Sequence, residues 1–381
     1  MLTVCLVTRN AEETLPQALA SVRGVANQVV VVDTGSTDRT ATLAAELGAE
    51  VGPFAWDDDF AAAQNAALAQ VRGEWVLWLN PDEELLPESR PLLAACLTRP
   101  EAFAYTTLIQ QQTAADQRDR LVAVWDYRLF RRHAEVRYIG RCHPRFLTPL
   151  GELARREGMQ VLPSTVTLRR HVYRSPLTPD KLRWSARLLA KELQDRPGQL
   201  DYLIDYGHTL LLLNDPAGHA VLADAAQQLF AFRDDPVPPF PAVQRLLGYL
   251  LTVSPEQARA PITRDEAAEL ARRWFPVSPP LLWALAEQAF HRGDYLAAMR
   301  LLETLVQLGK TETYDRSLPF DPSIISEAAL LNLGVCYARL GELDLADYCF
   351  GQLLTAENYR QKAQEGLDLV RQLRRGTGPE R

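Results

Sequence analysis

The sequence lacks the features that mark several large classes of protein. It contains no Cys-x-x-Cys pair, and its five cysteines are an odd number, so they cannot close into a complete set of disulfides. No apolar run reaches the ~18 residues that a membrane-spanning helix needs. The first residues carry no basic segment and no small-residue cleavage site, so we expect no secretory leader. We therefore predict reduced cysteines, no transmembrane segment and a cytoplasmic location.

The sequence also lacks an excess of positive charge. The 41 Lys and Arg residues face 48 Asp and Glu residues, which gives a net charge of −7 (41 − 48). A negative balance disfavours a broad surface for nucleic acid, so no nucleic-acid partner is expected. With 47% hydrophobic and 23% charged residues the chain is too apolar to be mainly disordered, and its 381 residues predict two or three domains.

The first hundred residues alternate between strand and helix patterns. Strands are expected at 4–7, 29–32, 49–51 and 75–79, and helices at 12–22, 38–47 and 57–71. This alternation predicts a mainly parallel sheet with helices on both faces. Residues 102–111 and 121–130 then form a predicted antiparallel pair across a turn near 116–120, and 161–168 is a further expected strand.

From about residue 180 the pattern becomes helical. Proline clusters at 236–241 and 276–280 interrupt it. Two segments align, Gly293-Asp-Tyr-Leu-Ala-Ala298 and Gly341-Glu-Leu-Asp-Leu-Ala346, and each lies between two apolar helical stretches. A helix, a glycine turn and a second helix make a unit that resembles a tetratricopeptide repeat. We therefore predict an α/β domain over 1–175, followed over 176–381 by a helical linker and an all-α repeat domain.

Polar clusters follow three of the predicted strands, at 8–10, 33–38 and 80–84. Ligands of open α/β sheets bind at such carboxyl ends. Asp33 can accept hydrogen bonds from a ribose or a base, but Asp, Ser and Thr are also the residues that cap a helix, so both explanations stay open. Asp82 can hold a divalent cation that bridges two phosphates, or it belongs to an acidic turn. The three clusters together favour a binding site.

Four segments, in this order, resemble family 2 of the inverting glycosyltransferases, which have the Rossmann-like GT-A fold. They are Leu6-Val-Thr-Arg-Asn-Ala-Glu12, Val30-Val-Val-Asp-Thr-Gly-Ser-Thr-Asp38, Asp59-Phe-Ala-Ala-Ala-Gln-Asn65 and Trp75-Val-Leu-Trp-Leu-Asn-Pro-Asp-Glu83. The resemblance covers residues 1 to about 175 and is greatest to a bacterial branch with tetratricopeptide repeats after the catalytic domain. The later Arg128-Leu-Phe-Arg131 and Tyr138-Ile-Gly-Arg-Cys-His143 resemble that branch as well.

The resemblance implies an inverting glycosyltransferase of the hexosyltransferase type. Its donor would be a nucleotide-diphosphate sugar, with a UDP-sugar expected, and its cofactor a divalent Mn²⁺ or Mg²⁺. The acceptor would be a protein or peptide presented by the helical repeats. The repeats can equally recruit a protein partner, or form a dimer or stabilise the fold.

The resemblance also implies roles for individual residues. Asp33 would contact the uridine or ribose, and Thr8 to Asn10 would wall the base. The nucleotide-sugar residues implied are Thr8, Arg9, Asn10, Glu12, Asp33, Asn65 and Asn80. The metal ligands implied are Asp82, His143 and His171, although a structural histidine explains His171 equally well. Asp126 is our candidate for the base that deprotonates the acceptor, with a surface or structural acid as its alternative.

Three positions depart from the family pattern. Asn80 stands where an Asp is usual, Gln64 where an Arg is common, and Pro144 where a Glu is common. An amide can still form hydrogen bonds but brings no charge to a metal or a phosphate. The alternative hypothesis is therefore a catalytically inactive glycosyltransferase-like scaffold whose repeats bind a protein partner.

Overall fold

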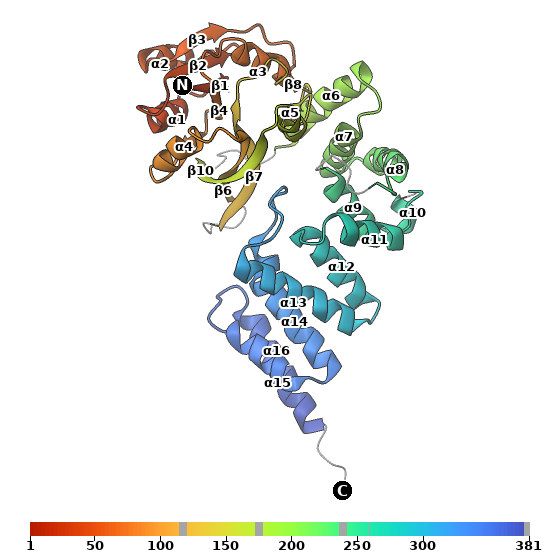
Figure 1. Cartoon of the computed structure of the whole chain (residues 1–381). Helices are drawn as coiled ribbons and strands as arrows, with labels where there is room; N and C mark the ends of the chain where they lie inside the picture. Colours follow the sequence, from red (N-terminus) through yellow and green to blue (C-terminus); the bar gives the residue numbers. More distant parts are fainter. Residues whose placement is uncertain (114–119, 172–177, 236–241, 259, 377–381) are drawn as a thin grey trace. The chain divides into compact units, whose positions relative to one another are not determined.

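The chain forms two compact units, Met1–Gly198 and Gln199–Arg381 (Figure 1). The computed structural model describes residues 1–113, 120–171, 178–235, 242–258 and 260–376. The division falls later than the expected cut near residue 175 because helix α6 (Pro179–Asp195) belongs to the first unit. The backbone N–H of Arg141 donates to Glu192 of this helix at 2.8 Å, and the Arg141 guanidinium pairs with Asp195.

Eight strands of the first unit form one sheet within the described residues. In chain order they are β1 (Leu2–Thr8), β2 (Gln28–Asp33), β3 (Glu50–Pro53), β4 (Trp75–Trp78), β5 (Glu83–Leu85), β6 (Ala102–Thr113), β7 (Arg120–Arg131) and β10 (Gln160–Arg170). In space their order is β3-β2-β1-β4-β7-β6-β10-β5. The β3-β2-β1-β4 half is parallel, and β7 runs antiparallel to both β4 and β6. A separate antiparallel pair contains β8 (Tyr138–Ile139) and β9 (Arg145–Phe146).

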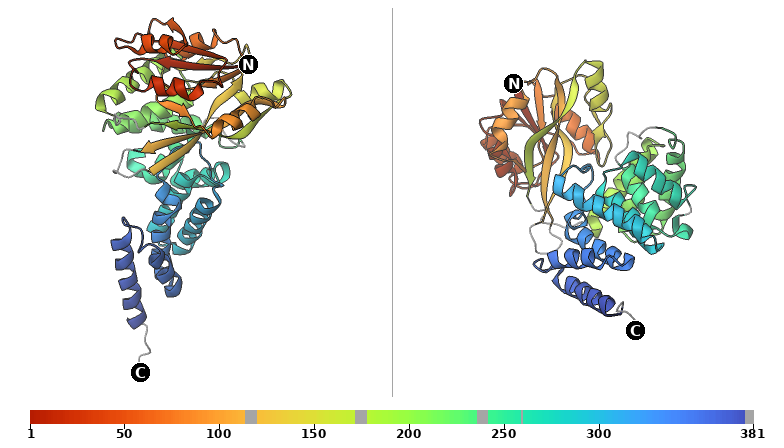
Figure 2. Two further views of the ribbon diagram at one scale, coloured as in Figure 1. Left: turned by 90° about the vertical axis from the view of Figure 1, so that its left-hand side faces the viewer. Right: turned by 60° about the horizontal axis from the view of Figure 1, so that its bottom comes forward.

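Helices cover both faces of this sheet, as the alternating sequence pattern predicts (Figure 2). They are α1 (Leu15–Val22), α2 (Thr40–Glu46), α3 (Phe60–Leu68), α4 (Ser89–Cys96) and α5 (Leu150–Arg156). Buried residues of α1, α2 and α4 share a hydrophobic core with β1 and β4, whereas those of α3 and α5 pack with Val30, Val32 and Trp78 on the other face. The strand ends between these layers remain free to carry polar side chains.

The predicted strands and helices of the first unit are confirmed, with shifted ends. The helix expected over 57–71 is shorter because Asp59 caps α3 by accepting a hydrogen bond from the Ala62 N–H at 2.9 Å. The antiparallel pairing of 102–111 with 121–130 is confirmed as β6–β7. Most of the turn predicted near 116–120 lies outside the described residues.

The described residues of the second unit form helices joined by turns and loops, with no strand among them. Its α-helices are α7 (Leu200–Leu212), α8 (Ala217–Phe230), α9 (Val243–Thr252), α10 (Pro255–Ala258), α11 (Arg264–Trp274), α12 (Pro279–His291), α13 (Tyr295–Thr311), α14 (Glu327–Leu340), α15 (Leu343–Gln352) and α16 (Arg360–Gly376), with a 3₁₀ turn at Pro322–Ile325. No helix among the described residues of the chain has both the length and the apolar character needed to cross a membrane.

The predicted repeats correspond to the pairs α12–α13 and α14–α15. Gly293 and Gly341 adopt the left-handed backbone, with φ values of 78° and 82°, which ends the first helix of each pair at low cost. Ala298 and Ala346 are fully buried and occupy equivalent positions in the second helices. Their small side chains fit the close contact between paired helices that a tetratricopeptide-like unit requires.

Candidate functional site

The ends of β1 and β2 bring two predicted site residues together. Thr8 lies opposite Asp33 in the parallel ladder. Oδ1 of Asp33 accepts hydrogen bonds from the backbone N–H of Ser36 at 3.0 Å and from its hydroxyl at 2.7 Å, so this carboxylate caps its own turn. The Thr8 hydroxyl is buried and has no hydrogen-bond partner among the described residues. Asp33 therefore has a structural function, whereas the Thr8 hydroxyl beside it could still form a hydrogen bond with a ligand.

The loop after β1 is tied to the loop after β2 by its side chains. Oδ1 of Asn10 accepts a hydrogen bond from the Thr37 N–H at 2.8 Å, and Oε2 of Glu12 accepts one from the Arg39 N–H at 3.0 Å. Asn10 adopts a left-handed backbone with φ 49°, which asparagine tolerates better than most residues. Arg9, next to it, is exposed. The two loops thus form one linked wall beside the strand ends.

The third strand end, after β4, is organised around Glu83. The Asn80 backbone N–H donates to Oε2 of Glu83 at 2.9 Å, and the Asn80 side-chain amide donates to Oε1 at 3.0 Å. The Glu83 side chain is 0% exposed. Asp82, between them, has a side chain that is 26% exposed and whose Oδ2 lies 3.8 Å from Nε of Arg170. Asn80 therefore positions Glu83, and Asp82 is left available.

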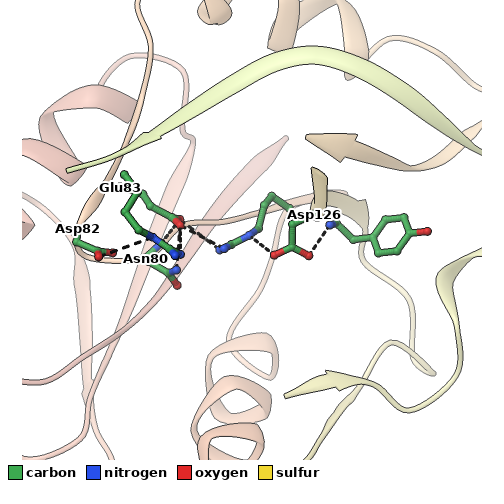
Figure 3. Close-up of polar contacts among 7 residues, drawn as sticks. Asn80, Asp82, Glu83 and Asp126 are labelled. Carbon is green, nitrogen blue, oxygen red and sulfur yellow. Dashed lines mark hydrogen bonds and ion pairs between the residues drawn. The ribbon is translucent and has the colours of Figure 1, made fainter. Parts of the chain in front are cut away.

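Five side chains around Glu83 form a row in which negative and positive charges alternate (Figure 3). We call it the charge row; its members in order are Asp126, Arg128, Glu83, Arg170 and Asp82. Nε of Arg128 lies 2.8 Å from Oδ2 of Asp126, and its two terminal nitrogens each lie 3.2 Å from an oxygen of Glu83. Arg170 donates to Oε1 of Glu83, and its Nε lies 3.8 Å from Oδ2 of Asp82.

The sheet order explains how residues so far apart in sequence meet. Arg128 lies on β7, Arg170 on β10 and Glu83 on β5. Arg170 is the direct partner of Glu83 in the antiparallel β10–β5 ladder. The row therefore depends on β10 inserting between β6 and β5, and it places the predicted base Asp126 and the predicted metal ligand Asp82 at its two ends.

Burial and charge act differently on the two acids at Asp82 and Glu83. Burial alone raises the pKa of the Glu83 carboxyl, but the two adjacent guanidinium groups outweigh it and leave the pKa below its ordinary value. For Asp82, burial prevails over the more distant Arg170, and the Glu83 charge adds to burial, so its pKa is raised. Glu83 is thus a permanently charged structural anion, whereas the ionised form of Asp82 lacks a close cation.

The two predicted histidine ligands differ in position. The His171 backbone N–H donates to the Asp82 carbonyl at 2.9 Å, and its Nε2 lies 3.3 Å from Oε1 of Glu84, so it adjoins the Asp82 turn. His143 lies in the loop between β8 and β9 and adopts a left-handed backbone with φ 50°. In the described part of the chain, no three His, Cys, Asp or Glu side chains gather in an arrangement that could hold a metal ion.

Asn65 has a structural task in α3. Its amide donates to the Tyr138 carbonyl at 2.9 Å and accepts from the Tyr138 N–H at 2.8 Å, which fastens α3 to β8. Both ends of its side chain are therefore occupied, and its predicted contact with the donor stays a prediction. Asn65 also lines a cavity of about 490 Å³ with residues of α3, β4 and β7, among them Leu68 and Phe130. The neighbouring Gln64 has a buried Oε1 with no partner among the described residues.

Asp126, the candidate base, has a half-exposed side chain at 51%. Its Oδ1 accepts a hydrogen bond from the Tyr127 N–H at 2.7 Å and its Oδ2 accepts from Arg128. The carboxylate is thus fixed in orientation but reachable from solvent.

Sequence reasoning assigned no role to Glu83, Arg128 or Arg170. Arg128 was visible as part of the Arg128-Leu-Phe-Arg131 segment, and Glu83 directly follows Asp82. Arg170 gave no signal, because its contact with Glu83 depends on a strand order that is not sequential.

Comparison with known proteins agrees with this architecture. The family model for glycosyl transferase family 2 matches residues 3–160. A TPR repeat-containing protein of Synechococcus elongatus is 42% identical over 137 residues, which are 35% of this chain and 32% of that protein. An uncharacterized glycosyltransferase of Rickettsia bellii is 28% identical over 124 residues, or 32% of this chain and 42% of that protein. The chain thus spans less than half the length of these curated relatives.

A solved structure of lower similarity is glucosyl-3-phosphoglycerate synthase from Mycobacterium tuberculosis. It is 18% identical, with a TM-score of 0.38, over 52% of this chain and 81% of that one. The family match, the strand order and the helical pairs confirm the resemblance drawn from the sequence motifs. The N-terminal part of the chain is therefore a glycosyl transferase family 2 domain of the GT-A fold, followed by tetratricopeptide-like helical repeats.

Proposed function

We propose that the chain transfers a hexosyl group, with inversion, from a nucleotide-diphosphate sugar to an acceptor hydroxyl, and that the donor is a UDP-sugar. The observation that supports this most is the charge row, which fixes two partly exposed carboxylates, Asp82 and Asp126, relative to each other. Transfer of the sugar by direct displacement requires two things: stabilisation of the departing nucleoside diphosphate and a base that deprotonates the acceptor hydroxyl. Asp82 and Asp126 are assigned to these two tasks.

In this proposal Asp126 removes the proton from the acceptor hydroxyl. Its two oxygens each accept one hydrogen bond, from Tyr127 and Arg128, so the carboxylate is oriented before the acceptor arrives. Its half-exposed side chain leaves room for an approaching hydroxyl. The nucleoside would bind at the ends of β1 and β2. The residues we assign to it are Thr8, Arg9, Asn10, Glu12 and Asp33.

The donor set at Asp82 fits Mg²⁺ or Mn²⁺ bound mainly through the substrate. Magnesium in phosphate-transferring sites keeps several waters and takes one or two carboxylates together with phosphate oxygens. Asp82 supplies one partly exposed carboxylate, and Asn80 adds no charge. When bound, such a cation would neutralise charge on the leaving diphosphate. His171, whose backbone N–H donates to the Asp82 carbonyl, is the further ligand that we propose, and the role expected for His143 stays a prediction.

For the acceptor we propose a protein or peptide that the helical repeats bind. The supporting observation is the pair of helix–turn–helix units, since stacked units of this kind form extended binding surfaces. The alternative, an inactive scaffold with the repeats as its working part, is motivated by Asn80, which replaces a charged metal ligand with an amide.

Nucleotide release tests the enzyme against the scaffold. We expect the full chain, given UDP-sugars with Mn²⁺ or Mg²⁺, to release UDP. Asp126→Asn, which removes the base, should lower that rate by about 100-fold or more, and Asp82→Asn should lower it at least tenfold. Asp180→Asn, at a position whose side chain is 90% exposed, is the matched control and should have no effect. UDP binding without release in any mixture would favour the scaffold, and absence of nucleotide binding would rule out both the donor and its site.

A further inference from the structure

One buried nitrogen of the charge row has no hydrogen-bond partner among the described residues. The Arg170 guanidinium donates to Glu83 through one terminal nitrogen, but its Nε is buried and has no hydrogen-bond partner among the described residues. Oδ2 of Asp82 is the nearest opposite charge, at 3.8 Å, which is beyond hydrogen-bond distance. A buried N–H without an acceptor is unfavourable, so an oxygen placed here by a ligand would be stabilised.

The two arginines of the row differ in how fully they are used. Arg128 is shared between Glu83 and Asp126, with all three side-chain nitrogens donating, and its side chain is only 8% exposed. Among the described residues Arg170 donates a hydrogen bond only to Glu83, and its side chain is 20% exposed. Arg128 is therefore a closed structural link, whereas Arg170 retains both donor capacity and access.

The charge row as a whole does not attract an anion. Three carboxylates and two guanidinium groups sum to −1 (2 − 3). Asn80 and Gln64 contribute no charge at the positions where the family pattern carries charged residues. Besides a metal ion at Asp82, a diphosphate there would need a cationic donor from the chain, and Arg170 is the charge-row arginine with an unused donor among the described residues.

We propose that Arg170 is a phosphate-binding residue that contacts the diphosphate of the donor, and that Glu83 is the positioning residue that holds it there. A planar guanidinium matches the spacing of phosphate oxygens, and hydrogen bonds between two charged groups are stronger than neutral ones. Arg170 keeps one terminal nitrogen on Glu83 and turns its unbonded Nε from Asp82 to a phosphate oxygen. The inference rests on the proposed function, because it places the diphosphate beside Asp82.

Comparing two ligands isolates the phosphate contact. Titration calorimetry of the full chain with UDP and with uridine, in the presence of Mg²⁺ and again with EDTA, gives the contribution of the two phosphates. We expect Arg170→Ala to weaken UDP binding about tenfold or more and to leave uridine binding unchanged. Arg170→Lys, which keeps the charge but loses the planar fork, should restore part of the affinity for UDP in both conditions.

Arg169→Ala is the matched control. Arg169 is the neighbouring residue on β10, its side chain is 45% exposed, and it lies 3.7 Å from Glu84 rather than from the charge row. The Arg169→Ala variant should bind UDP with the same affinity as the unaltered chain. Unchanged UDP binding by Arg170→Ala would overturn the inference. An equal loss of UDP and uridine binding would also overturn it, since that result indicates a structural role. Failure of the unaltered chain to bind either ligand would instead reject the proposed function and, with it, this contact.

Discussion

The two units of the chain bury polar groups in different ways. The first unit buries charges, with Glu83 and Arg128 almost without exposure and linked to two further carboxylates and a second arginine. The second unit buries a largely neutral cluster around Gln244, whose amide bonds Ser317 and Asp315 and accepts from the Ser278 hydroxyl at 2.7 Å. Buried ion pairs repay their loss of hydration poorly, so they are weak evidence for stability. We therefore expect the charge row to matter more for the proposed site than for stability.

The largest expected effect comes from removing the centre of the charge row. Glu83→Ala leaves two guanidinium groups without their shared anion, and breaking such a buried pair costs about 3 to 5 kcal/mol in the free energy of unfolding. Gln244→Ala should cost about 1 to 3 kcal/mol, since its partners each lose a hydrogen bond and the one charged partner, Asp315, is only half-buried. Urea unfolding of both variants measures the difference. Equal losses would show that burying charge and burying amide are equivalent in this chain.

A pH-dependent effect of intermediate size is expected in the second unit. Burial lowers the pKa of His208 from 6.5 to about 4, with Arg245 adding to the shift and Asp205 opposing it. Below pH 6.5 the unfolded chain binds a proton at this histidine that the folded unit does not, so stability falls as the pH drops from about 6.5 toward 4. The loss attributable to His208 reaches up to about 3 kcal/mol.

The variant His208→Gln removes this contribution. Thermal unfolding of both proteins between pH 7 and pH 4 should show a shallower decline for the variant. Parallel declines would mean that His208 titrates normally in the folded unit.

The smallest expected effect concerns helix packing in the last repeat. A Cβ added at Gly366 of α16 would lie 2.6 Å from the Phe350 ring, which is closer than side chains pack. Gly366→Ala should therefore destabilise the chain by about 1 kcal/mol net, because overpacking costs about 1–3 kcal/mol and helix propensity returns up to about 1 kcal/mol. Gly351→Ala, on α15 where the added Cβ meets no atom within 4 Å, should be neutral or slightly stabilising. Melting temperatures of the two variants check the sign.

The sequence predicted those features that depend on neighbours along the chain. The run of β-branched residues in β2 and the glycine turns at Gly293 and Gly341 each encode local structure, and all three appear where expected. The polar strand ends also placed Asp33 and Asp82 at one edge of the sheet, because parallel strands share the direction of their carboxyl ends.

What the sequence could not supply is pairing between distant strands. The contact of Arg170 with Glu83 exists because β10 lies between β6 and β5, far from its neighbours in sequence. Tertiary contact also explains the two hydrogen bonds between the Asn65 side chain and the Tyr138 backbone, which no local sequence pattern indicates. The raised pKa of Asp82 also depends on burial by residues distant in sequence. The sequence of its turn alone does not distinguish an exposed acid from a buried one.

The insertion of β10 has a practical consequence for dissecting the protein. Similarity to the family ends at residue 160, where this strand begins. A fragment cut there would lose β10 and leave β6 with an unpaired backbone edge and β5 without its neighbour, and open edges of this kind promote aggregation. A fragment meant to fold on its own should instead extend to Gly198, where the first compact unit ends.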